Sequence, residues 1–392
     1  MRIGVFHNRY LQRGGEDSVV DFSVELLAKA GHEVHLFAID NREEIAAVRG
    51  GALRAALYAR WNPTIAARVA EFVAQHPIDV AHVHNTFPLL SPSLHPALRE
   101  RGIPVVQTLH NYRLLCANGL FFRAGRPCEA CVERGPWNAV RHGCYRGSRA
   151  QTLVWSEMTA HHRRRGTWPA SADLFTAPSE FARARLWPAD LPATRVRVVP
   201  NPVADPGKPG GAREGAVFVG RLSPEKGVGL LLEAWRALDG FPLTIAGTGP
   251  EEPRLRALAD EIPGVRMLGE VSRERVAELL GGAAFAVAPS LWYETFGMAV
   301  AEAMAAGTAV VAPSDTAMAE LVETGRNGLL FQRGDGSSLT DACRTLAADP
   351  DTCRSMGEEG RLLYEDTLAP DTAVTRLEKI YEEALSLHSE GA

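Results

Sequence analysis

The chain has 392 residues, more than a single hydrophobic core usually serves, so two domains of ordinary size are expected. Hydrophobic residues make up 46% of the chain and charged residues 23%, which is typical of a globular enzyme and excludes a disordered or fibrous protein. The formal net charge of -5 gives no overall attraction to nucleic acid, so we expect no nucleic-acid partner.

The N-terminus runs directly into a strand-like segment at residues 1–6, without the apolar core and cleavage site of a signal peptide. No apolar stretch approaches the roughly 20 residues that a membrane-spanning helix needs. We therefore expect a cytoplasmic protein whose only membrane contact is peripheral, at the inner membrane. The basic run at 161–165, near Trp168, Phe175 and Trp187, would suit such a contact, although a solvated face is the ordinary interpretation.

Strand-like runs alternate with helical patterns along the whole chain, which is typical of βαβ units on a parallel sheet. The sequence therefore predicts an α/β fold with two doubly wound, Rossmann-like domains. The first half has expected strands at 3–6, 33–38, 80–84 and 105–109 and expected helices at 19–30 and 65–74. The second half has expected strands at 216–219, 243–246, 265–268, 284–288 and 309–312.

A stretch rich in Gly and Pro at 203–214 suits neither a helix nor a central strand, so we place the hinge there. The predicted domains are 1–200, with a Cys-rich insert at 112–148, and 201–370. The amphipathic segment 371–392 is expected to be a helix that returns to the first domain. Open α/β sheets bind ligands outside the carboxyl ends of their strands, so functional residues are expected in the loops that follow them.

Two cations follow the expected strand 216–219. Arg221 and Lys226 stand just before a helical run that begins at Val228. A helix N-terminus offers free amides and partial positive charge, so this place would suit a diphosphate. An ordinary loop with solvated basic residues is the alternative.

Two carboxylates follow the expected strand 284–288, with seven residues between them. Glu294 would lie in the loop before a helix and Glu302 about one turn inside it, so both could reach one ligand while nearby amides face a phosphate. Carboxylates accept hydrogen bonds from vicinal sugar hydroxyls. A helix cap at Glu294 and a surface residue at Glu302 is the other interpretation.

The run Glu-Thr-Phe-Gly-Met-Ala-Val-Ala-Glu-Ala-Met-Ala-Ala-Gly at 294–307 resembles the E-x7-E motif of retaining glycosyltransferases of family 4. The resemblance extends to 218–227, 245–251 and 327–330. It implies the GT-B fold, with two Rossmann-like domains facing across a cleft and a C-terminal helix that crosses back. It also implies a nucleotide diphosphate sugar as donor and catalysis without a metal cofactor.

The resemblance assigns roles in the second domain. Arg221 and Lys226 would hold the donor diphosphate, Glu302 the ribose hydroxyls and Glu294 the transferred sugar. The amides of Phe296, Gly297, Met298 and Ala299 would assist, and main-chain contacts near Leu268 and Val271 would hold the base.

In the first domain, Gly14, Gly15 and Glu16 resemble the glycine-rich loop that approaches the donor phosphate or the acceptor. His110 matches the histidine that lies near the transferred sugar, so Glu16 and His110 form the implied acceptor side. His110, Glu294, Arg221 and Lys226 are the implied catalytic residues. His82 and His84 would share one strand face and are interpreted as structural.

Four cysteines of the insert follow the pattern C-x11-C-x2-C-x12-C, namely Cys116, Cys128, Cys131 and Cys144. In a reducing compartment a structural zinc ion could organise this loop, so we predict zinc. An iron-sulfur cluster and unligated thiols remain alternatives.

These observations predict a retaining hexosyltransferase that acts on a sugar, lipid-linked or small-molecule acceptor in cell-surface or exopolysaccharide assembly. Glycosylation of a secondary metabolite is one alternative, and a nucleotide-sugar 2-epimerase of the same architecture is another. A non-catalytic sugar-binding protein is disfavoured because both cations, both glutamates and His110 are present. A nicotinamide-dependent oxidoreductase is disfavoured because Gly247 and Gly249 are followed by Glu252 where G-x-G-x-x-G needs its third glycine.

Overall fold

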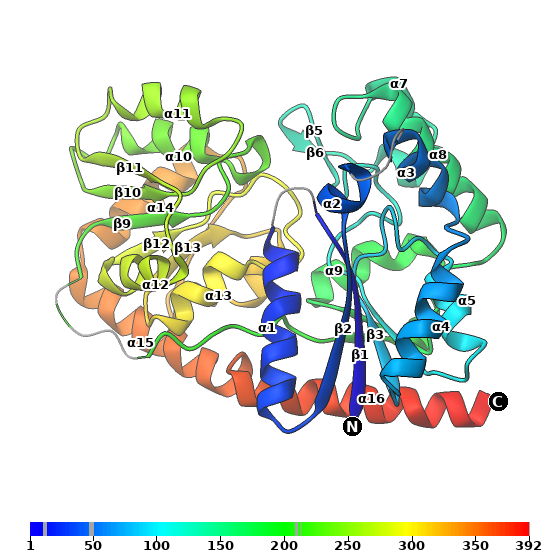
Figure 1. Ribbon diagram of the computed structural model, residues 1–392. Coiled ribbons are helices and arrows are strands. Elements are labelled where there is room, and N and C mark those ends of the chain that lie inside the picture. Colours follow the sequence, from blue (N-terminus) through cyan, green and yellow to red (C-terminus); the bar gives the residue numbers. More distant parts are fainter. Residues whose placement is uncertain (11–13, 47–50, 208–210, 212, 392) are drawn as a thin grey trace. The chain divides into compact units, whose positions relative to one another are not determined.

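The computed structural model describes residues 1–10, 14–46, 51–207, 211 and 213–391. Positions 208–210 and 212 of the predicted hinge lie outside the described residues. The chain divides into two compact units (Figure 1). The first unit comprises Met1–Phe121, Glu129–Pro202 and the C-terminal residues from Ala373, and the second comprises Phe122–Cys128 and Val203–Thr372.

The first unit is built on a parallel sheet, which in the described residues has six strands in the order β2-β1-β3-β4-β7-β8. The inner strands read as nearly continuous apolar runs because helices cover both faces of a parallel sheet. The strands are β1 (Arg2–Arg9), β2 (Glu33–Asp40), β3 (Val80–Val83), β4 (Val105–Thr108), β7 (Leu174–Ala177) and β8 (Val196–Val198). The helices are α1 (Gly15–Lys29), α2 (Asn41–Ala46), α3 (Gly51–Arg60), α4 (Ile65–Gln75), α5 (Leu94–Arg99), α6 (Ala130–Arg134), α7 (Asn138–His142), α8 (Arg149–Arg164) and α9 (Glu180–Leu186), with 3-10 turns η1 (Trp187–Ala189) and η2 (Ala193–Arg195).

The second unit repeats this plan with the strand order β11-β10-β9-β12-β13-β14 among its described residues. Successive residues of β9 enter opposite layers of the core: Ala216 and Phe218 pack in one apolar cluster and Val217 in the other. The strands are β9 (Ala216–Val219), β10 (Leu243–Ala246), β11 (Val265–Gly269), β12 (Phe285–Val287), β13 (Ala309–Pro313) and β14 (Gly328–Phe331). The helices are α10 (Val228–Trp235), α11 (Glu252–Ala259), α12 (Arg273–Gly282), α13 (Met298–Ala305), α14 (Gly336–Ala347) and α15 (Pro350–Thr367), with 3-10 turns η3 (Pro224–Lys226) and η4 (Ala317–Glu320). A short hairpin of β5 (Phe122–Arg123) and β6 (Arg126–Pro127) groups with this unit.

The C-terminal helix α16 (Pro370–Gly391) places its residues from Ala373 onward in the first unit, as the sequence predicts. Leu377, Ile380, Tyr381 and Ala384 are spaced as one helical face and pack in the core of the first unit. The Tyr381 hydroxyl lies 2.8 Å from Nδ1 of His82, which is buried beside β4. His82 therefore joins the last helix to the sheet.

The predicted fold class is confirmed, since both halves are parallel-sheet Rossmann-like units. The sequence did not predict β7, β8 or β14, which have three or four residues each. Helix α1 begins at Gly15, four residues before the start of the predicted helix 19–30.

Candidate functional site

In each sheet the order of the strands reverses at one point, and residues singled out from the sequence follow the strands that meet there. In the first unit β1 lies between β2 and β3, and in the second unit β9 lies between β10 and β12. In such sheets the crevice outside the carboxyl ends of the two diverging strands is the place where ligands bind. The sequence-predicted residues of each unit are therefore considered at its own switch point.

In the second unit, Lys226 and Glu294 are brought together from the two sides of the switch point. Lys226 ends the turn that follows β9, and Glu294 lies in the loop after β12. The Lys226 ammonium donates to Oε1 of Glu294, and the Ser290 hydroxyl donates to the same oxygen over 2.9 Å. Lys226 also lies over the Trp292 ring, 5.5 Å from its centroid. Glu294 is buried, so this ion pair fixes its carboxylate.

The loops that carry these two side chains are joined through their main chains. The Leu291 amide donates to the Glu225 carbonyl over 2.8 Å. Gly227 has a φ of 72°, and a Cβ atom at this position would lie 2.0 Å from the Pro289 carbonyl oxygen. Only glycine allows this approach, so Gly227 sets the separation of the two loops.

Helix α13 presents its N-terminus after the second loop. Gly297 is its N-cap residue with a φ of 102°, and the amides of Met298 and Ala299 are among the first of the helix, which have no intrahelical acceptor. Glu302 lies on this helix and is half-buried. Burial raises the pKa of Glu302 to about 7, and Arg273 acts in the opposite direction.

The other predicted residues of the second unit lie at the same edge of the sheet. Arg221 is exposed directly after β9. Leu268 is in β11 and Val271 follows it, both half-buried, at the sheet's edge strand. The loops after β9 and β12 and the start of α13 therefore carry two cations, helix amides and two carboxylates, of which Lys226 and Glu294 are in contact. Such a set can bind an anion at one end and hydroxyl groups at the other.

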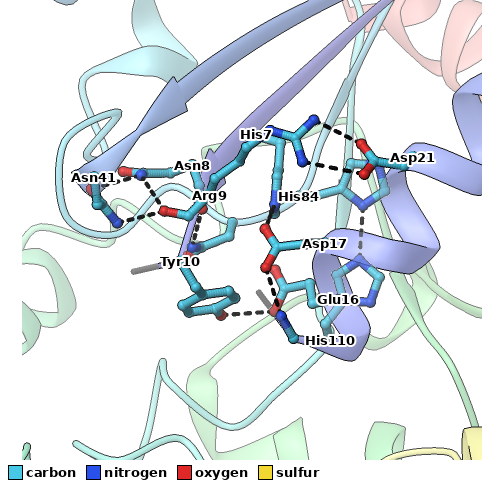
Figure 2. Close-up of polar contacts among 12 residues, drawn as sticks. His7, Asn8, Arg9, Tyr10, Glu16, Asp17, Asp21, Asn41, His84 and His110 are labelled. Carbon is cyan, nitrogen blue, oxygen red and sulfur yellow. Dashed lines mark hydrogen bonds and ion pairs between the residues drawn. The ribbon is translucent and has the colours of Figure 1, made fainter. Parts of the chain in front are cut away.

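In the first unit, Gly14 and Glu16 open helix α1 rather than forming a free loop. The Gly14 amide donates to Oδ2 of Asp17 over 3.0 Å, which completes the capping of the helix. Glu16 follows in the first turn, and its Oε2 accepts from the Tyr10 hydroxyl over 2.8 Å and from Nδ2 of Asn111 over 3.1 Å (Figure 2). Glu16 is therefore oriented from two sides.

His110 directly contacts His84, a residue that the sequence suggested was structural. His84 Nδ1 lies 2.8 Å from His110 Nε2, and the rings stack with centroids 5.1 Å apart (Figure 2). Burial lowers the pKa of both, so both are neutral near pH 7. Nε2 of His84 is buried with no partner among the described residues. An unpartnered lone pair costs less than an unpartnered N–H, which assigns the shared proton to His84 Nδ1 and makes His84 the donor.

A second buried pair, which the sequence analysis missed, lies beside these histidines. His7 Nε2 and Asp17 Oδ1 are 2.8 Å apart, and both side chains are almost fully buried (Figure 2). Burial by itself would raise the pKa of Asp17, but the hydrogen bonds from His7 and the Gly14 amide outweigh it, so this pKa is lowered. The rings of His7 and His84 are 6.2 Å apart. The signal in the sequence was a histidine near the end of β1 and an acid in the first turn of the next helix.

A pocket that opens to solvent lies beside these residues in the first unit. Glu16 and His110, the predicted acceptor-side residues, both line it, and His84 and Arg113 line it as well. The pocket therefore combines a carboxylate, two neutral imidazoles and a guanidinium group.

The four cysteines of the insert, for which the sequence predicts zinc, differ in their surroundings. Cys116 donates from its Sγ to Oδ1 of Asn118 over 3.0 Å, and burial raises the pKa of this thiol. Cys131 packs in an apolar cluster that includes Trp155, with Cys144 against it, while Cys128 groups with the second unit. In the part of the chain that the structure describes, no group of three or more His, Cys, Asp or Glu side chains could hold a metal ion. Zinc at the cysteines of the insert therefore stays a prediction from the sequence.

Comparison with known proteins identifies the class of protein that this fold and these residues define. The family model described as Glycosyltransferase Family 4 matches residues 13–205, and the model described as Glycosyl transferases group 1 matches residues 213–349. The chain is 30% identical over 317 residues to the alpha-maltose-1-phosphate synthase of Mycolicibacterium smegmatis, a match that covers 72% of this chain and 73% of that protein. This protein is a GT-B glycosyltransferase.

The chain belongs to the family 4 glycosyltransferases that these models describe. The sucrose-phosphate synthase of Thermosynechococcus elongatus shares the fold with a TM-score of 0.73 at 19% identity, covering 98% of this chain and 99% of that one. Anabaena HepE in complex with UDP-glucose has a TM-score of 0.69 at 16% identity, covering 96% and 98%. Some matches are shorter: an uncharacterized glycosyltransferase of Methanocaldococcus jannaschii is 28% identical over 43% of this chain and 47% of its own length.

Proposed function

We propose that the protein is a retaining hexosyltransferase that uses a nucleotide diphosphate sugar. The observation that supports this most is the contact of Lys226 with the buried Glu294 at the switch point of the second unit. An ammonium group beside a buried carboxylate suits a ligand that has a diphosphate attached to a hydroxyl-rich ring. The similar fold of Anabaena HepE, whose structure contains UDP-glucose, agrees with a uridine nucleotide as the first donor to test.

In this proposal the diphosphate leaves and the acceptor hydroxyl attacks on the same face of the sugar. The bond between the anomeric carbon and the phosphate oxygen breaks, the new glycosidic bond forms, and the acceptor proton goes to the departing phosphate oxygen. Lys226, Arg221 and the first amides of α13 stabilise the charge that grows on the diphosphate. No protein nucleophile and no metal ion are required.

A donor screen tests this function. UDP-, GDP-, ADP- and TDP-hexoses are added to the full chain, and thermal unfolding is followed because a bound donor stabilises the folded protein. The donor that raises the melting temperature is then incubated with candidate acceptors, and NMR gives the anomeric configuration of the product. We expect retention. An inverted product, or stabilisation by none of the donors, contradicts the proposal.

The same incubation without acceptor addresses the alternative of a nucleotide-sugar 2-epimerase. An epimerised donor sugar would appear only for the isomerase. Saccharide acceptors and small hydroxylated metabolites, tested in parallel, separate cell-surface glycan assembly from glycosylation of a secondary metabolite. We propose glycan assembly as the first role to test.

We also propose a peripheral contact with an anionic membrane through one face of the first unit. Helices α3 and α7 both pack against α8, and the large apolar side chains Leu57, Trp61, Trp137 and Leu153 are exposed on or beside them. Residues 126–168 carry eight arginines and three glutamates in a chain of net charge -5. Basic groups beside exposed aromatic rings suit the headgroup region of an anionic bilayer.

The predicted basic run at 161–165 is only partly on this face. His162 is buried and bonded to the Arg60 carbonyl, and Trp168 is buried, whereas Trp187 is exposed. Among the described residues, no helix is both long and apolar enough to cross a membrane.

Co-sedimentation with vesicles tests the membrane contact. The wild type should bind vesicles that contain phosphatidylglycerol and remain unbound with phosphatidylcholine alone. Replacing Trp137 and Leu153 by Ser should weaken binding at least about tenfold, since each removes roughly 1.5–3 kcal/mol of apolar burial. Equal binding to both vesicle types excludes the electrostatic contact.

A further inference from the structure

The pocket of the first unit has features that select the chemical class of its ligand. Its polar lining includes Glu16, His84 and His110, and its apolar lining includes Phe87 and Trp168. Arg113 also lines the pocket. A hydroxylated ligand with an apolar ring face would suit most of this lining. The guanidinium group of Arg113 needs a different partner, a hydrogen-bond acceptor.

Arg113 is held in place without a carboxylate partner. Its Nη1 donates to the Ala117 carbonyl over 3.1 Å, and its guanidinium group stacks on Phe87 and Tyr145 at 5.2 and 5.6 Å from the ring centroids. Among the described residues, no carboxylate lies within the 4.0 Å of an ion pair with Arg113. The carboxylate in the pocket, Glu16, instead accepts hydrogen bonds from Tyr10 and Asn111.

Two further nitrogens of the pocket residues lack acceptors in the described part of the chain. Nε of Arg113 and Nε1 of Trp168 are both buried and unpartnered. Both can only donate hydrogen bonds, and a buried N–H without an acceptor costs about 1–3 kcal/mol. Asn111, by contrast, already uses its amide on Glu16. The pocket therefore has unpartnered donors at Arg113 and Trp168, and Arg113 has no ion-pair partner among the described residues.

We infer that the pocket binds an acceptor through an oxyanion, a carboxylate or a phosphate, held by Arg113. Arg113 and Trp168 supply the donors that the oxyanion oxygens need, and small side-chain rotations bring their N–H groups to it. Glu16 and His110 then face a hydroxyl group of the same ligand. The inference rests on the proposed function, since it names the acceptor class: an acidic sugar or a phosphate-bearing acceptor.

Small probes test this inference without any turnover. The full chain is titrated with acetate, with inorganic phosphate and with acetamide, the uncharged counterpart of acetate, after saturation with UDP to occupy the second unit. The readout is the indole N–H signal of Trp168 in ¹H–¹⁵N spectra, assigned with the variant Trp168→Phe. We expect acetate or phosphate to bind at least about tenfold more tightly than acetamide, as followed by the shift of this signal, because a hydrogen bond to a charged group is stronger than one to a neutral group. Tighter binding of acetate identifies the acceptor group as a carboxylate, and tighter binding of phosphate identifies it as a phosphate.

Arg113→Gln should abolish the preference for anions, and Arg113→Lys should keep part of it. Arg146→Gln is the matched control, because Arg146 stacks on the same Tyr145 ring and does not line the pocket. An acetamide shift as strong as that of acetate, or an anion preference that persists in Arg113→Gln, overturns the inference. If UDP fails to bind, the proposed donor is wrong, while the Trp168 signal still reports on the pocket.

Discussion

Lys226 is the residue whose removal tests the second unit most directly, because its ammonium group contacts the buried Glu294. Lys226→Ala should lower turnover by about two orders of magnitude, the scale found for loss of one donor to a developing charge. Arg221→Ala should act in the same direction. Steady-state kinetics measure the effect, and Lys29→Ala, at an exposed i,i+4 ion pair on α1, is the control.

The Lys226→Ala substitution also leaves Glu294 buried without a cation, which by itself lowers stability. Adding Glu294→Gln removes that charge. The double variant should regain most of the melting temperature while its turnover stays low. Wild-type turnover in both Lys226→Ala and Arg221→Ala would refute the electrostatic role.

Glu302 should make nucleotide binding depend on pH near neutrality, because burial raises its pKa to about 7. Below this pKa the side chain is a neutral acid, and above it the carboxylate would accept charge-assisted hydrogen bonds from the ribose hydroxyls of the proposed donor. UDP affinity, measured by calorimetry, should therefore rise up to about tenfold from pH 6 to pH 8. The Gln side chain of Glu302→Gln does not titrate, so the pH dependence of UDP affinity in this variant comes from UDP itself. Parallel pH profiles for the wild type and the variant would show that Glu302 does not contact the nucleotide.

At the residue scale, the sequence singled out Lys226 and Glu294, which the structure brings into contact. It missed the buried cluster that contains His84 and His7. These residues lie far apart in the chain and meet only because β1 and β3 are neighbours in the sheet. A pattern along one strand cannot show which side chain of the next strand it will contact.

At the element scale, Gly227 controls how closely the loops after β9 and β12 approach. Gly227→Ala should destabilise the protein by about 1–2 kcal/mol for its positive φ and by about 1–3 kcal/mol more for the overlap with the Pro289 carbonyl. Gly334→Ala is the matched control, since its φ of 79° is similar and a Cβ there meets nothing within 4 Å. Denaturant unfolding of both variants measures the difference. Equal losses of stability would show that the contact with Pro289 is unimportant.

The regular elements divide into those that a local pattern reveals and those that it does not. Strands β9 and β10 have the predicted bounds, because each is a short apolar run between turn residues. Strand β8 has three residues and is recognisable only through its pairing with β7. Helix α1 starts before the predicted residue because the Asp17 carboxylate accepts a hydrogen bond from the Gly14 amide. The other oxygen of this carboxylate contacts His7, a residue distant in the chain.

At the scale of the whole molecule, buried histidines should make the first unit sensitive to mild acid. Burial lowers the pKa of His82 to about 3 and that of His162 to about 4, and it also lowers the pKa of His84, His95 and His110. An unfolded histidine binds its proton near pH 6.5, whereas these remain neutral in the folded chain. Their contribution to the free energy of unfolding is therefore present above pH 6.5. It is lost as the pH falls from 6.5 towards 4, by about 1.4 kcal/mol per histidine and pH unit.

Calorimetry at pH 7.5, 6.5 and 5.5 tests this dependence. The melting temperature should fall by several degrees between pH 6.5 and pH 5.5. His82→Gln can still bond Tyr381 and Thr108 but does not titrate, so its melting temperature should fall less steeply. The absolute stability of this variant is not the readout, since only the two slopes are compared. Identical slopes would mean that His82 does not contribute.

The amino-acid sequence by itself determined the alternation of strands and helices, the two Rossmann-like halves and the return of the last helix. These features follow from local periodicity and from the requirement that each apolar face be covered. The tertiary structure alone decided the order of the strands, and with it the contacts of Lys226 with Glu294 and of His84 with His110. It also decided the surroundings of the insert cysteines, and that Arg113 lines a pocket with no carboxylate partner in the described part of the chain. Such contacts join residues distant in the chain, and their energies depend on burial and on partners that no local pattern encodes.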